Sequence, residues 1–242
     1  MTIAEHIAAV RREMAEAARE SGRSERDIIL VGASKMNDAA ACQEAIAAGV
    51  DALGENRVQE MTAKLAQNAY DGAPLHFIGH LQRNKVRQVV GKAALIQSIG
   101  SEALLREVEK EAARQQLVQD ILLEVNIGGE ESKSGVSPEK LWPLLDAAAA
   151  AEHIRVKGLM AIPPVNDDDA QNRRYLAQVY KLFVQAGERG YQNVKMETLS
   201  MGMSGDFENA IREGATLVRI GTGFCAKIRR KSDKAGVWRV IM

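Results

Sequence analysis

The sequence has few cysteines and no long apolar run. Among its 242 residues are two cysteines, Cys42 and Cys225, which lie far apart and form no CxxC motif. This usage excludes a disulfide framework and is typical of a reducing compartment. No apolar stretch approaches the roughly 18 residues that a membrane-spanning helix needs. We therefore expect a cytoplasmic protein with no membrane partner.

An excess of charge of one sign is also absent. The 32 basic residues balance the 32 acidic ones, which argues against nucleic acid as a partner. Hydrophobic residues make up 46% of the chain, enough for a full-sized core. Residues 1–20 are amphipathic, but their glutamates argue against a transit peptide. We predict a surface helix there.

Short apolar runs alternate with helix-like stretches along the chain. The runs are mostly apolar throughout, which is typical of strands buried on both faces of a parallel sheet. The strand-like runs are 27–34, 51–54, 75–79, 95–99, 120–126, 155–162, 195–201 and 216–221. The helix-like stretches are 38–48, 56–67, 82–90, 102–116, 138–151, 168–189 and 204–213. Helix-starting residues, among them Asp38, Ser101 and Ser137–Pro138, and the helix-ending Gly49, Gly190 and Gly214 punctuate these stretches.

This order of elements predicts an α/β fold, a (β/α)8 TIM barrel with an extra N-terminal helix. A doubly wound open sheet is the alternative, but it usually has fewer strands. No linker or composition break divides the chain, so we expect residues 1–242 to form a single domain. No large apolar surface stripe stands out, which favours a monomer.

Glycine-rich segments end the seventh and eighth predicted strands, where such barrels often bind phosphate. Glycines let the backbone approach an anion, and hydroxyl and amide groups donate to it. Each segment alone is also compatible with an ordinary turn, whereas the pair together favours a ligand phosphate. The residues concerned are Ser200, Gly202, Ser204 and Gly205, with Gly221, Thr222 and Gly223 opposite them.

A lysine, Lys35, ends the first predicted strand. An amine rooted in a barrel mouth is partly desolvated, and the neutral form attacks an aldehyde to give a Schiff base. An aldehyde that carries a phosphate suggests pyridoxal phosphate. If the eighth strand directs Arg219 inward, its guanidinium could meet the pyridine nitrogen. The alternatives are a solvated lysine and an internal salt bridge from Arg219 to Glu55 or Glu124.

Seven segments, in this order, resemble the pyridoxal phosphate homeostasis protein family, also called the proline synthetase co-transcribed homologue family. They are GASK (32–35), GENRVQE (54–60), HFIGHLQRNK (76–85), VNIGGEESKSG (125–135), GLMAIPP (158–164), LSMGMSGDFENAI (199–211) and VRIGTG (218–223). The resemblance extends over residues 28–224, and the third and sixth segments are the most specific. The family is related to the barrel domain of alanine racemase, a fold-type III pyridoxal phosphate protein.

The resemblance implies that pyridoxal 5'-phosphate is held as an internal aldimine on Lys35. It implies that Arg219 faces the ring nitrogen, that Asn56 lies beside the cofactor and that the Ser200–Ser204 loop contacts the phosphate. The full set of implied cofactor-binding residues is Lys35, Asn56, Ser200, Gly202, Met203, Ser204, Arg219, Gly221 and Thr222.

Other features carry less specific predictions. His80 matches a family histidine, but its role is open; its spacing from His76 on a strand-to-loop segment does not suit a metal. Lys133 is either a second aldehyde-reactive amine or a solvated loop lysine. The sequence departs from the family pattern at Met36 and the two residues after it, and again at 223–226.

Three functions are compared. The resemblance implies pyridoxal phosphate homeostasis, in which the protein buffers the aldehyde or delivers it to apoenzymes without robust turnover. An amino-acid racemase needs a second base, which related racemases take from a further domain that we expect this chain to lack. Its own tyrosines lie away from the predicted mouth: Tyr70, Tyr175, Tyr180 and Tyr191. A Schiff-base aldolase would need a carboxylate near Lys35, and Glu55 is the candidate.

Overall fold

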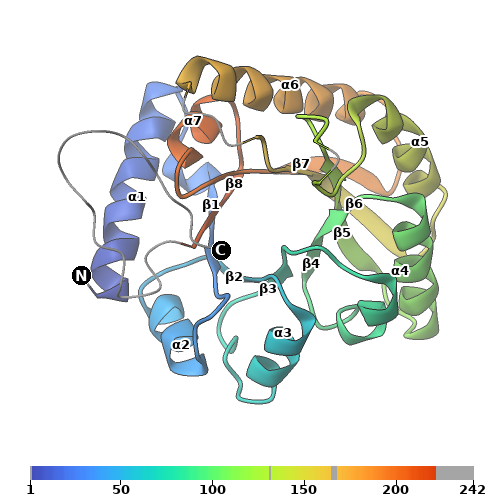
Figure 1. The fold of residues 1–242 in the computed structure, drawn as a ribbon, viewed down its shortest axis with the longest axis horizontal. Helices are drawn as coiled ribbons and strands as arrows, with labels where there is room; N and C mark the ends of the chain where they lie inside the picture. The colour runs from blue at the N-terminus through green and yellow to red at the C-terminus, as the bar shows by residue number, and fades with distance from the viewer. Residues whose placement is uncertain (1, 131, 165–167, 222–242) are drawn as a thin grey trace.

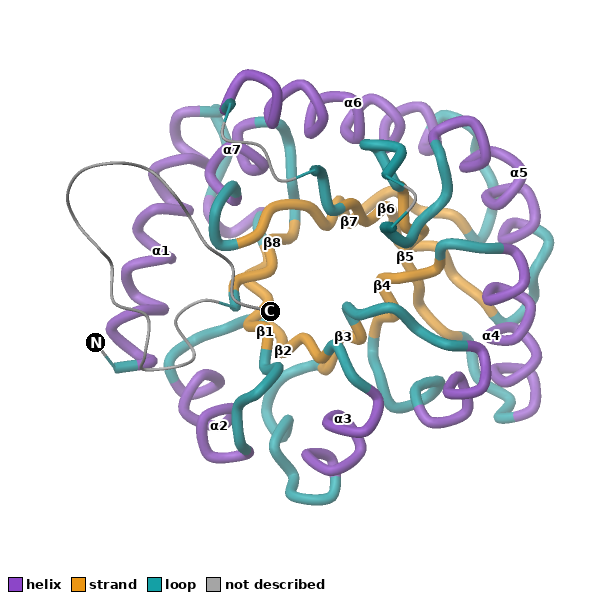
Figure 2. The backbone as a smooth tube through the Cα atoms, viewed as in Figure 1, coloured by secondary structure: helices purple, strands orange, loops and turns teal. Residues whose placement is uncertain are grey.

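The strands close into a barrel. The structure is a computed structural model and describes residues 2–130, 132–164 and 168–221. Eight parallel strands follow in chain order, from β1 (Ile29–Ala33) to β8 (Leu217–Ile220), which pairs with β1 and closes the ring. Figure 1 shows helices around this ring, and Figure 2 separates the strands inside from the helices outside. The predicted TIM barrel is confirmed.

The remaining elements alternate as the sequence predicts. The other strands are β2 (Ala52–Glu55), β3 (Leu75–Phe77), β4 (Leu95–Ile99), β5 (Gln119–Val125), β6 (Ile154–Ala161) and β7 (Val194–Met203). The helices are α1 (Ile3–Glu20), α2 (Ala39–Ala47), α3 (Val58–Leu65), α4 (Glu102–Arg114), α5 (Pro138–Ala149), α6 (Asp169–Gly187) and α7 (Phe207–Arg212), with 3-10 segments η1 (Glu25–Asp27) and η2 (Arg83–Gln88). None of these helices is both long and apolar enough to cross a bilayer.

The N-terminal helix takes a place in the outer ring. A capping box begins it: the Thr2 hydroxyl accepts from the Glu5 amide while the Glu5 carboxylate accepts from the Thr2 amide. Its apolar face, with Ile7, Val10 and Met14, is buried. In Figure 1 the helix lies between α7 and α2, and it contacts both. The predicted amphipathic helix therefore covers that side of the barrel.

Side chains along each strand alternate between the barrel axis and the helix layer. Residues on the outer parity, such as Leu30 and Leu53, belong to the large core between strands and helices. Two small separate clusters fill the barrel interior: Val31, Ala52 and Leu217, and Leu95, Leu122 and Met160. Arg219 shares the parity of Leu217 and so belongs to the inner face, whereas Lys35 lies in the turn that follows β1.

Three predicted elements differ from the structure. The helix expected at 82–90 is the 3-10 segment η2, whose three-residue repeat buries Val86 and Val89 together. The third strand ends at Phe77, two residues early. The helix expected from Ser204 begins only at Phe207, because residues 203–206 form a turn closed by the Asp206 amide on the Met203 carbonyl.

Candidate functional site

A chain of buried hydrogen bonds crosses the barrel interior. Arg219 on β8 donates from Nη1 to the Ser200 hydroxyl on β7, and from Nη2 to the Ala161 carbonyl at 2.9 Å. Ser200 donates to Oε1 of Gln97 on β4 at 2.6 Å. The Gln97 amide contacts Nδ1 of His76 on β3 at 3.0 Å. The guanidinium of Arg219 is thus held by groups on β6 and β7, and the chain of hydrogen bonds continues to β4 and β3.

The donor and acceptor in each of these hydrogen bonds follow from the side chains involved. Arginine only donates, so the Ser200 hydroxyl accepts from Arg219 and donates its own hydrogen bond to Gln97. The Gln97 NH2 group then donates to His76, whose Nδ1 must be the unprotonated nitrogen. Burial lowers the pKa of His76 to about 4, which agrees with a neutral ring. Burial also lowers the pKa of Arg219 to about 10, a value that leaves it charged at neutral pH.

The alternative of an internal salt bridge for Arg219 finds little support. Glu55 pairs with Lys64 instead, and Arg219 donates to a hydroxyl and a carbonyl. Glu124, from β5, is 4% exposed and accepts from the Ser134 hydroxyl at 2.7 Å. Burial raises the pKa of Glu124, while the charge of Arg219 opposes that rise. Glu124 is therefore an electrostatic neighbour of Arg219.

Lys35 stands at the mouth, above this buried layer. A side-chain carbon placed on Gly221 would lie 3.9 Å from Lys35 Cε and 3.4 Å from Ala33 Cβ, so the lysine stem runs past the end of β8. The Gly221 amide donates to the Ser204 hydroxyl at 3.2 Å. The Lys35 side chain is exposed in the described part of the structure, and its partial desolvation stays a prediction. The structure does bring Lys35, Gly221 and Ser204 together at one edge.

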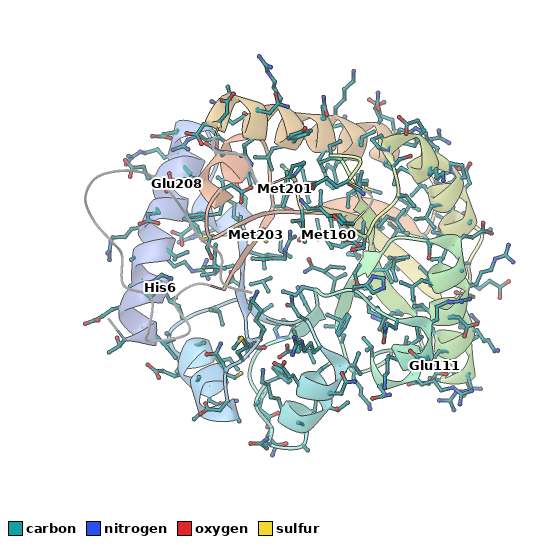
Figure 3. The ribbon with its side chains drawn as sticks, in the orientation of Figure 1. His6, Glu111, Met160, Met201, Met203 and Glu208 are labelled. Carbon is teal, nitrogen blue, oxygen red and sulfur yellow. The ribbon has the colours of Figure 1, made fainter. Side chains whose placement is uncertain are left out.

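The predicted Ser200–Ser204 loop is mostly strand. Residues 200–203 belong to β7, and the hydroxyl of Ser200 points into the barrel. Gly202 has φ +91, and a side-chain carbon there would lie 2.6 Å from Ala210 Cβ. Met203, labelled in Figure 3 beside the strand ring, is 37% exposed. Of this segment, only the turn after Met203 lies outside β7. A phosphate-binding role for this turn and for Ser200 stays a prediction.

The two remaining predicted cofactor residues have different outcomes. Asn56 follows β2 on the inner parity, and its buried Oδ1 has no hydrogen-bond partner among the described residues. A side-chain carbon on Gly79 would lie 2.2 Å from the Asn56 carbonyl oxygen, so Gly79 permits this close approach. Asn56 thus offers an acceptor close to the mouth. Thr222 lies outside the described residues.

Two side chains with open roles are also placed. His80 is exposed, and its charge acts on Glu124. His76 is buried against Gln97, so the two histidines do not converge as metal ligands. Lys133 forms an ion pair with Glu130 and donates to the Pro163 carbonyl at 3.2 Å. These contacts describe a tethered loop lysine rather than a freely solvated one.

Sequence reasoning missed two groups of residues. Gln97 interrupts the apolar run LIQSI, and a polar residue inside a buried strand is the signal that could have identified it. Lys64 and Glu60 are four apart on α3, the spacing of an intrahelical pair, and Lys64 is only 8% exposed. We call Lys64, Glu55 and Glu60 the Lys64 cluster. It lies on the helix side of β1 and β2.

The buried His76 predicts a pH-dependent stability. Its folded pKa of about 4 lies below the ordinary 6.5, so the unfolded chain binds more protons between these values. Its stabilising contribution is therefore complete above pH 6.5 and is lost as pH falls toward 4. Between pH 7 and pH 5 we expect this group to remove about 2 kcal/mol from the free energy of unfolding.

Urea unfolding of the wild type and of His76→Gln at both pH values measures this contribution. The glutamine keeps an acceptor for Gln97 but does not titrate. Glu124 contributes an opposite pH trend to both proteins, so subtracting the two free energies of unfolding cancels that contribution. Equal pH slopes for the wild type and His76→Gln would contradict the prediction.

The fold and the site together define a class: a parallel barrel with a mouth lysine and a buried arginine facing its axis. The sequence matches the family described as alanine racemase, N-terminal domain, over residues 6–225. A solved alanine racemase from Corynebacterium glutamicum is similar in fold, with a TM-score of 0.65 at 15% identity; the match covers 93% of this chain and 64% of that one.

Relatives of higher sequence identity identify the family within this class. A pyridoxal phosphate homeostasis protein from Aquifex aeolicus is 41% identical over 222 residues, which is 92% of this chain and 96% of that protein. The structure of PipY from Synechococcus elongatus with PLP bound has a TM-score of 0.79 at 30% identity, covering 92% of this chain and 99% of that one. This chain belongs to the pyridoxal phosphate homeostasis protein family.

Proposed function

We propose that the protein binds pyridoxal 5'-phosphate as a reversible Schiff base on Lys35 and serves its homeostasis by buffering or delivering it. The observation that carries this proposal is the placement of one exposed amine beside Gly221 and Ser204, above the buried Arg219. The relatives support it by name, and PipY was solved with PLP bound.

Each side chain has a distinct part in binding. When bound, pyridoxal 5'-phosphate would supply an electrophilic aldehyde carbon, and Lys35 would be the amine that holds it. Amide and hydroxyl groups of the Ser204 turn and Gly221, which already bond to each other at 3.2 Å, would be the groups that contact the phosphate. Arg219 presents a donor that remains charged, which disfavours protonation of a ring nitrogen beside it.

A racemase would need a second base, and the positions of the tyrosines give little support for one. The hydroxyl of Tyr70 reaches toward Glu55 at 3.4 Å on the helix side of the strands, not toward the mouth. Burial raises the pKa of Tyr70, so its phenol stays protonated. Tyr175 and Tyr180 lie on α6, and Tyr191 donates to Asp146. We therefore propose a carrier without robust turnover.

The alternative of a Schiff-base aldolase also has little support. It needs a carboxylate that can exchange protons with a substrate held on Lys35. Glu55, the candidate, is fully buried on the outer parity and accepts from Lys64, from Ser34 and from the Asn56 amide. Its two oxygens are already engaged on the side away from the mouth.

Borohydride reduction of the loaded protein tests the proposal. Reduction makes the imine permanent, and digestion with peptide mass measurement should find the pyridoxyl group on the peptide that contains Lys35. The loaded protein incubated with L-alanine should yield no D-alanine. An adduct on another residue, no adduct at all, or clear formation of D-alanine would each contradict the proposal.

A further inference from the structure

A buried ionic network lies directly behind Lys35. In the Lys64 cluster, Lys64 Nζ and Glu55 Oε2 are 2.6 Å apart, with side chains 8% and 0% exposed. Glu60, one helical turn before Lys64 on α3, joins the pair at 3.8 Å. Glu55 shares the outer parity of Leu53, and Lys64 and Glu60 come from α3, so the charges of the cluster lie in the helix layer.

Two members of the cluster hold the peptide groups on either side of Lys35. Lys64 Nζ donates to the Ser34 carbonyl at 2.6 Å, and a Glu60 oxygen accepts from the Met36 amide at 3.1 Å. Residues 34 and 36 are thus anchored to the same helix. The reactive side chain stands between the two anchors.

The backbone at Met36 needs such an anchor. Met36 has φ +61, in the left-handed region, and its side chain is 84% exposed. For a residue other than glycine this conformation is unfavourable by about 1–2 kcal/mol, and an exposed side chain offsets little of that. The hydrogen bond from the Met36 amide to the Glu60 carboxylate is a contact that favours this conformation.

The cluster also reaches a second predicted cofactor residue. The other oxygen of Glu55 accepts from the Asn56 amide at 2.8 Å, and the oxygen shared with Lys64 accepts from the Ser34 hydroxyl at 3.0 Å. One carboxylate therefore joins the ends of β1 and β2. It thereby links the residue before Lys35 to Asn56.

Stability alone does not account for this arrangement. Removing a lysine and a glutamate from water carries a large desolvation penalty, and apolar residues of similar volume are often as stabilising. An ionic network gives directional contacts that an apolar replacement lacks. Placement of a reacting amine is sensitive to displacements on the order of 1 Å.

We propose that Lys64, Glu55 and Glu60 are positioning residues that fix residues 34–36, so that the Lys35 amine meets the aldehyde in a reactive orientation. The proposal rests on the proposed function of Lys35. Lys64 is not a second site of attachment, because its own amine is buried against Glu55 and the Ser34 carbonyl.

Replacement of Lys64 by methionine tests the proposal in the full-length protein. We expect the rate of imine formation with pyridoxal 5'-phosphate to fall roughly tenfold or more. Binding of pyridoxine 5'-phosphate, which has an alcohol in place of the aldehyde, should stay within about twofold, since the ring and phosphate contacts remain. Lys181→Met, at an exposed lysine on α6, is the matched control and should behave as the wild type.

Glu60 provides a milder pair of variants should Lys64→Met fail to fold. Its side chain is 27% exposed, so substitution leaves the buried Lys64–Glu55 pair intact. Glu60→Leu removes the acceptor of the Met36 amide, and imine formation should slow by about threefold to tenfold. Glu60→Gln keeps an acceptor oxygen and should restore most of the rate.

The outcomes separate the two proposals. A parallel loss of imine formation and pyridoxine 5'-phosphate binding, or no change in either, would overturn the positioning role. Equal rates for Glu60→Leu and Glu60→Gln would overturn the anchor at Met36. A wild-type protein that forms no reducible adduct on Lys35 would instead overturn the proposed function itself.

Discussion

Replacement of Lys35 by alanine should abolish covalent attachment of pyridoxal 5'-phosphate. The variant should lack the yellow colour of the loaded protein, and borohydride should leave no pyridoxyl adduct. The reason is chemical: within the described residues, Lys35 supplies the amine beside Gly221 and the Ser204 turn. Since Lys35 is exposed, its replacement should change the free energy of unfolding by less than about 0.5 kcal/mol.

Two controls make this result specific. Lys133→Ala removes the tethered loop lysine and should keep both the colour and the adduct on Lys35. Pyridoxine 5'-phosphate should bind Lys35→Ala and the wild type alike, because it cannot form an imine. A reducible adduct that persists on another lysine in Lys35→Ala would contradict the assignment.

The second large effect is expected at Gly158 on β6. This glycine has φ +150, and a side-chain carbon there would lie 1.8 Å from the Thr198 carbonyl oxygen. Because β6 is paired with β5 and β7 on both sides of this bulge, its backbone cannot move without breaking ladder hydrogen bonds. We expect Gly158→Ala to lower the free energy of unfolding by more than about 4 kcal/mol.

The variant Gly190→Ala distinguishes the effect of the steric clash on stability from that of backbone strain. Gly190 also has a positive φ, of +69, but no atom lies within 4 Å of the added carbon. Its replacement should therefore show strain alone, about 1–2 kcal/mol. Denaturant unfolding measures both variants. A loss at Gly158 no greater than that at Gly190 would show that the two strands can separate at little energetic cost.

The effect at Gly158 should extend to the site. Ala161, three residues further along β6, accepts from Arg219 through its carbonyl. Moving β6 away from β7 would also disturb Ser200, which pairs with Met160 in the ladder. The bulge that Gly158 permits thus contributes to the position of the buried guanidinium.

Much of the fold was predictable because its signal is local. Uniformly apolar runs separated by helix-like stretches identify buried parallel strands, whatever their partners. Lys35 and Arg219 were predicted for the same reason, since their place at or near a strand end follows from the length of each run. The 3-10 segment η2 was missed because its apolar residues also fit an α-helix.

The site was less predictable where its contacts are long-range. Ser200 was assigned to a phosphate loop from its glycine-rich neighbours. In the structure its hydroxyl donates to Gln97, 103 residues away in the sequence, and accepts from Arg219. Glu55 was considered both as a partner of Arg219 and as an acid near Lys35. The structure pairs it with Lys64 on the opposite face of the strand.

By itself the sequence determined the strand and helix order, the terminal lysine of the first strand and the glycine-rich ends of the last two. Tertiary structure alone decided which polar groups meet, because closing the barrel sets the register of eight strands and the face on which each side chain lies. A shift of one residue would exchange Lys35 with Ser34 and Arg219 with Ile220. The end of β1, which leads to the amine at the mouth, lies beside the buried guanidinium because β1 pairs with β8 in this one register.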